Sequence, residues 1–109
     1  MAQSPRSLNI SFEVLASHPN KEWLLADLRK QIAKDFNCLS TEVPERELET
    51  WLKEHLKKLQ TELGSLSDLL YRIDLNEKYW GEEHSVLASA ILKREAIKVY
   101  FRAKYSGRI

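Results

Sequence analysis

Three basic side chains near the end of the chain have the spacing most suited to binding a ligand. Arg94, Lys98 and Arg102 stand four residues apart, so on a helix they form one stripe. Such a stripe can neutralise nucleic-acid phosphates, or it can meet the carboxylates of a protein partner. Leu87 and Ile91 continue the same side of the helix toward its N-terminal end. Together these residues indicate a contact strip of mixed apolar and basic character.

Trp23 is a further candidate for contact, because it falls outside the apolar stripe of its own predicted helix. Aromatic and arginine side chains are enriched at protein interfaces. We therefore interpret Trp23 and the contact strip as partner-binding candidates, with another protein or a second copy of the chain as the occupant. The alternative is that the basic stripe binds a nucleic-acid backbone, weakly and with strong salt dependence, since about three phosphate contacts are few.

The histidines and the single cysteine lack the spacing that metal or covalent chemistry requires. No histidine follows a Glu by three residues, as in the metal sites of helical bundles, and no HExxH or EF-hand motif occurs. Cys38 stands alone, which excludes an internal disulfide, and we interpret it as a structural thiol. His55 lies in a leucine-rich face, and two interpretations are open. It is either a general base in a groove or a polar residue at the core boundary. The second interpretation is favoured because no nucleophile accompanies it.

The overall charge and composition exclude several broad classes of function. Seventeen Lys and Arg oppose sixteen Asp and Glu, a net charge of +1, so no overall field attracts nucleic acid or a membrane. No run of the sequence approaches the roughly 20 apolar residues that cross a bilayer. We therefore predict a soluble, cytoplasmic, non-catalytic protein without cofactor, metal or membrane contact, acting as an adaptor, a regulatory subunit or a homo-oligomer.

Helices must position these residues, because apolar side chains recur at helical spacing through most of the chain. A hydrophobic fraction of 43% with only three Gly and three Pro is typical of a compact helical domain. Four main helices are predicted, at about 20–37, 44–63, 65–78 and 83–106. A short helix at about 8–17 is also predicted, although the residues Leu8, Ile10, Phe12 and Val14 alternate as they would in a strand.

Local signals indicate where the helices begin and end. Asn20 can cap the first main helix, Pro44 fits the first turn of the second, and Gly64 suits its end. Connections of about two to seven residues favour antiparallel neighbours. The prediction is therefore an all-α antiparallel bundle, with residues 1–6 as a flexible N-terminus and residues 7–109 as a single domain.

The last predicted helix, at about 83–106, is expected to be buried over more than half of its circumference. Its predicted core face consists of Val86, Ala90, Leu92, Ala96, Ile97, Val99, Tyr100, Phe101 and Ala103. On this assignment the contact strip with its basic stripe lies at the surface.

Overall fold

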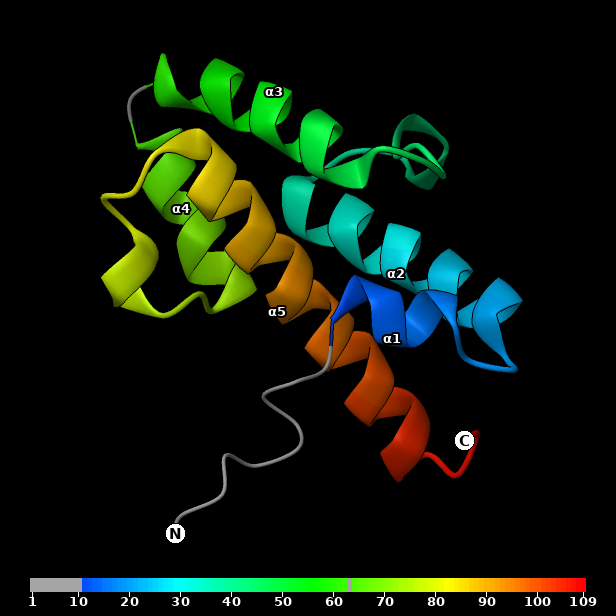
Figure 1. Cartoon of the computed structure of the whole chain (residues 1–109). Helices are drawn as coiled ribbons and strands as arrows, with labels where there is room; N and C mark the ends of the chain where they lie inside the picture. The colour runs from blue at the N-terminus through cyan, green and yellow to red at the C-terminus, as the bar shows by residue number, and fades with distance from the viewer. Residues whose placement is uncertain (1–10, 63) are drawn as a thin grey trace, which may run out of the picture.

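The described residues of the computed structural model, 11–62 and 64–109, form an all-α fold without strands, as predicted (Figure 1). The helices are α1 (Phe12–Ala16), α2 (Lys21–Phe36), α3 (Leu48–Gln60), α4 (Ser65–Ile73) and α5 (His84–Tyr105), with the 3₁₀ helices η2 (Ser40–Glu42) and η3 (Glu77–Tyr79). The predicted flexible segment 1–6 and the predicted helical residues 8–10 lie outside the described residues. No helix within the described ranges combines the length and apolar character needed to cross a bilayer.

Helices α2 and α5 agree with their predicted bounds to within about a residue, whereas α3 and α4 are shorter than predicted. Helix α3 begins at Leu48 and not near Pro44, because Glu47 takes the left-handed conformation with φ of 55°. Helix α4 ends at Ile73 because Asp74 is also left-handed, with φ of 62°. The Leu75 N–H then donates to a carbonyl of the last turn, and the Leu75 side chain is buried. This arrangement is a common way to end a helix.

The connection between α2 and α3 runs back along α2, so these two helices are not the antiparallel neighbours that the short connections predicted. Arg29, in the middle of α2, donates from Nε to the carbonyl oxygen of Val43 at 3.1 Å, and the Val43 side chain is fully buried. The ring of Trp51, in α3, lies 5.6 Å from the ring of Phe36 at the end of α2. Helices α2 and α3 therefore run in the same general direction, and α5 returns in the opposite sense (Figure 1).

Helix α5 crosses both α2 and α3 and supplies a large part of the core. Three alanines in its buried face allow the neighbouring helices to approach closely. The buried residues of α5 are Leu87, Ala88, Ile91, Leu92, Glu95, Ala96, Val99 and Ala103. The apolar members of this set form one continuous cluster with the buried leucines of α2, α3 and α4.

The buried face of α5 is rotated relative to the predicted face. Leu87 and Ile91, predicted to be surface contact residues, are only 1% and 0% exposed and belong to the core. Val86, predicted to be buried, is 36% exposed. The prediction was wrong here because apolar side chains surround α5 on most sides, so the helical wheel alone does not distinguish the side that α2 and α3 cover.

Replacement of core and surface side chains of α5 tests this orientation. Ile91→Ala should lower the free energy of unfolding by about 2–4 kcal/mol, because it leaves a cavity in a fully buried position. Val86→Ala should lower it by less than about 1 kcal/mol, since part of that side chain already contacts water. Urea unfolding followed by circular dichroism measures both values. Equal losses for the two variants would contradict the orientation.

Candidate functional site

The basic stripe of α5 is directed toward the rest of the chain. Arg94 Nη2 lies 3.1 Å from Asp74 Oδ2, just beyond α4. Arg102 donates from Nη2 to the Oε1 atom of Gln31 on α2. Lys98 extends between α5 and α2 toward buried carboxyl groups. All three residues were predicted to bind an external partner, and the structure engages all three in contacts within the chain.

A buried polar seam, consisting of Gln31, Asp35, Glu95 and Lys98, joins α2 to α5. Lys98 Nζ lies 3.1 Å from Asp35 Oδ2 and 3.6 Å from Glu95 Oε2. Gln31 donates from Nε2 to the same Asp35 oxygen at 3.0 Å. Glu95 is completely buried, and Asp35 is nearly so. Sequence reasoning missed Glu95, although its spacing from Ile91, Leu92 and Val99 places it in their face of the helix.

The two carboxyl groups of the seam have opposite pKa shifts. Burial raises the pKa of Glu95 to about 9, and the neighbouring Asp35 adds to the increase while Lys98 opposes it. Burial also acts to raise the pKa of Asp35, but its interactions with Glu95, Gln31 and Lys98 outweigh burial and lower that pKa. At neutral pH the seam therefore holds an Asp35 carboxylate, a Lys98 ammonium and a protonated Glu95.

The seam is suited to a structural role. A substrate cannot contact Glu95 unless α5 moves, because the side chain has no exposed surface. Neither of its carboxyl oxygens meets the geometry of a hydrogen bond to any described residue. In residues 11–62 and 64–109, no three His, Cys, Asp or Glu side chains gather closely enough to hold a metal ion.

Trp23 lies at the junction of α2 with the C-terminal segment. It is half-buried and packs against the core. The guanidinium of Arg108 lies over its ring at 3.8 Å from the ring centre, and the same group pairs with Asp27 at 3.2 Å. This predicted contact residue therefore binds the end of its own chain and forms no patch with Leu87 and Ile91.

His55 occupies an aromatic cluster at the boundary of the core. Its ring lies 5.2 Å from Phe36 and 4.8 Å from Trp51. Partial burial lowers the pKa of His55, and the charge of Lys58 adds to this effect. These contacts are those expected of the core-boundary histidine that the sequence favoured.

The outer face of α5, defined here as Val86, Ala90, Lys93, Ile97 and Phe101, lies on the side of the helix away from its buried face, although Ala90 at its edge still packs against the core. Ile97 follows the buried Glu95 by two positions, which corresponds to about 200° around the helix. Tyr105 continues this face toward the end of the helix, where its ring stacks on Phe101 at 5.6 Å and is 82% exposed. Sequence reasoning placed most of these residues in the core.

Two adjoining grooves separate this face from the α4–α5 connection. The larger has a volume of about 510 Å³, and its walls include Lys78, Lys93 and Ile97. The smaller, of about 340 Å³, lies beside Val86. Tyr79, Ala90 and Lys93 line both grooves, so the two are continuous. The outer face is therefore an apolar and aromatic strip interrupted by Lys93, beside a groove of mixed lining that also includes Lys78.

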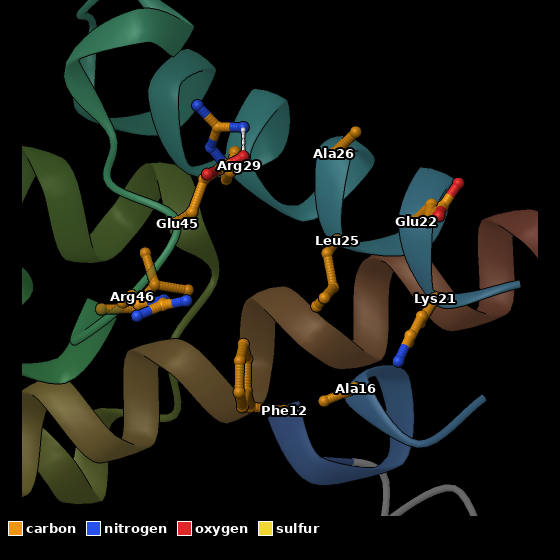
Figure 2. A pocket seen from close by; sticks show the side chains of 10 residues that line it. Phe12, Ala16, Lys21, Glu22, Leu25, Ala26, Arg29, Glu45 and Arg46 are labelled. Carbon is orange, nitrogen blue, oxygen red and sulfur yellow. Dashed lines mark ion pairs between the residues drawn. The ribbon is translucent and has the colours of Figure 1, made fainter.

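A separate cleft lies between α1, α2 and the start of α3. It has a volume of about 600 Å³ and is drawn in Figure 2. Its apolar walls come from both α1 and α2, and three cations and two carboxylates stand around it. The lining residues are Phe12, Ala16, Lys21, Glu22, Leu25, Ala26, Arg29, Glu45, Arg46 and Leu48.

Comparison of the chain with protein-family models, curated proteins and solved structures finds no match.

The protonation of Glu95 should make the stability of the protein fall as pH rises. Between its ordinary pKa of 4.5 and about 9, folded Glu95 retains a proton that the unfolded chain releases. Glu95→Gln remains neutral in both states. The Glu95→Gln variant should therefore match the wild type near pH 4.5 and exceed the wild type's free energy of unfolding by about 4–5 kcal/mol at pH 8. Urea unfolding across this pH range, with the exposed Glu54→Gln as control, measures the difference. A difference that does not change with pH would contradict the assignment.

Removal of Lys98 should expose its structural role. Lys98→Met leaves the buried Asp35 carboxylate without its cation and should cost about 3 kcal/mol of stability. Adding Asp35→Asn should recover part of the loss, because the remaining polar group is neutral. Chemical denaturation of both single variants and the double variant yields the coupling energy. Lys93→Met, on the exposed side of α5, is the matched control, and an equal cost for it would contradict the role of Lys98.

Proposed function

We propose that this protein is a non-catalytic helical domain that acts through protein–protein contacts made by the outer face of α5. The observation that supports the proposal is the presence of apolar and aromatic side chains on the side of α5 opposite the core. Val86 and Tyr105 are among the most exposed large hydrophobic residues of the described chain. An apolar centre surrounded by charged groups is the usual anatomy of a protein interface. The free thiol of Cys38 suits a reducing compartment such as the cytoplasm.

The charges around the outer face favour a partner with acidic side chains. Lys78 and Lys93 line the larger groove, and Lys104 lies one turn beyond Tyr100 on α5. One acidic residue, Asp74, also lines the larger groove, but its charge is already paired with that of Arg94. An amphipathic segment with carboxylates beside its apolar residues would complement this surface.

Two other classes of function have less support. Nucleic-acid binding by the basic stripe would require Arg94, Lys98 and Arg102 to leave their partners within the chain. Catalysis by the carboxyl group with the largest pKa shift would require access to Glu95, which is completely buried. The outer face of α5 needs no such rearrangement.

Site-specific photocrosslinking tests the proposal directly. A benzoylphenylalanine incorporated in place of Val86 or Ile97 should form an adduct with protein when irradiated in cells of the source organism. The same group in place of Glu54, an exposed residue of α3, should form none. Mass spectrometry of the adduct distinguishes a second copy of the chain from a different partner.

The result that would overturn the proposal is the absence of a protein adduct at both positions of α5, or equal adducts at the control position. An adduct that nuclease treatment shortens would favour the nucleic-acid alternative.

A further inference from the structure

We infer that the cleft between α1, α2 and the α2–α3 connection binds an amphipathic monocarboxylate, a small molecule with one carboxylate and an unbranched apolar chain. The cleft lies apart from the outer face of α5, so this inference is independent of the proposed protein contact. Its volume of about 600 Å³ falls within the range of small-molecule sites. Phe12, Ala16 and Leu25 line its middle and provide an apolar surface for the chain (Figure 2).

One end of the cleft presents an anchored guanidinium. Arg29 donates from Nε to the Val43 carbonyl at 3.1 Å, which holds the guanidinium in place and leaves its terminal nitrogens for a carboxylate. Figure 2 shows Arg46 at the same end of the cleft. Arginine binds carboxylates well because its planar group can donate two parallel hydrogen bonds.

The Glu45 carboxylate already pairs with the Arg29 guanidinium, but a ligand carboxylate can displace it. Its Oε1 atom lies 3.5 Å from Arg29 Nη1, and its side chain is 81% exposed. Exposed ion pairs contribute little to stability. A ligand carboxylate gains the same contact and also buries its apolar chain, so it can replace Glu45 at Arg29.

The other end of the cleft limits the length of the chain. Lys21 and Glu22 stand there, at the start of α2. Lys21 and Arg29 are about 12 Å apart along the axis of α2, at 1.5 Å per residue. A medium-length chain that starts at Arg29 therefore ends before the charged rim, whereas a long chain would reach water.

Titration with octanoate and octanol tests the inference. Amide chemical shifts, recorded by nuclear magnetic resonance on the whole chain, should move around Phe12, Leu25 and Arg46. Octanoate should bind about tenfold more tightly than octanol, because only octanoate makes charge-assisted hydrogen bonds to arginine. Equal affinities for the two compounds, or shifts elsewhere in the chain only, would overturn the inference.

Two substitutions at the arginine end of the cleft should change the affinity for octanoate in opposite directions. Arg46→Gln should weaken octanoate binding about threefold and leave octanol binding unchanged. Glu45→Gln should strengthen octanoate binding by a similar factor, because it removes the competing carboxylate. Glu54→Gln, which makes the same change of charge on α3 away from the cleft, is the matched control. Circular dichroism verifies that each variant is folded, and the inference fails if Glu45→Gln and Glu54→Gln have the same affinity.

Discussion

The contact of Lys98 with Asp35, beside a Glu95 that keeps its proton, is the interaction on which the packing of α5 depends. Burial of an unpaired carboxylate would cost several kcal/mol, so Asp35 needs its ammonium partner and its amide donor in place. A shift of α5 by one turn, about 5.4 Å, would separate these groups. The backbone carbonyl of the same Asp35 accepts a hydrogen bond from Arg72 on α4. One residue of α2 thus holds two other helices in register.

This constraint also determines which surface of α5 meets solvent. With Glu95 and Lys98 held against α2, the opposite side of the helix, with Ile97 and Phe101, must face outward. The apolar residues of that side are then available for a partner without cost to the core. Of the three cations that looked most suited to external binding, Arg94 and Lys98 instead neutralise a neighbouring and a buried acid, and Arg102 donates to Gln31. The place of each cation in the fold therefore decides its partner.

The cleft between α1 and α2 depends on a different feature, the path of residues 37–47 back along α2. The hydrogen bond from Arg29 to Val43 fixes that return. The left-handed conformation of Glu47 then turns the chain into α3. Glu45 and Arg46 are carried to one end of the cleft as a result, while α1 forms one of its walls. The cleft therefore combines residues that are more than 30 positions apart in sequence, from Phe12 to Leu48.

The sequence by itself determined the helical class, the bounds of α2 and α5, and the leucine face of α3, because these follow from local periodicity and from single residues such as Asn20, which directly precedes α2. Tertiary structure decided the rest. Pro44 permits a helix, but the turn at Glu47 prevents one until Leu48. Leu87 and Ile91 look like a surface strip beside a basic stripe, yet both are buried in the core. The burial of Glu95 depends on Asp35 and Lys98, and Asp35 is 60 residues earlier. Periodicity records which side chains are apolar, whereas only long-range packing determines which neighbour covers each side of a helix that is apolar on most of its surface.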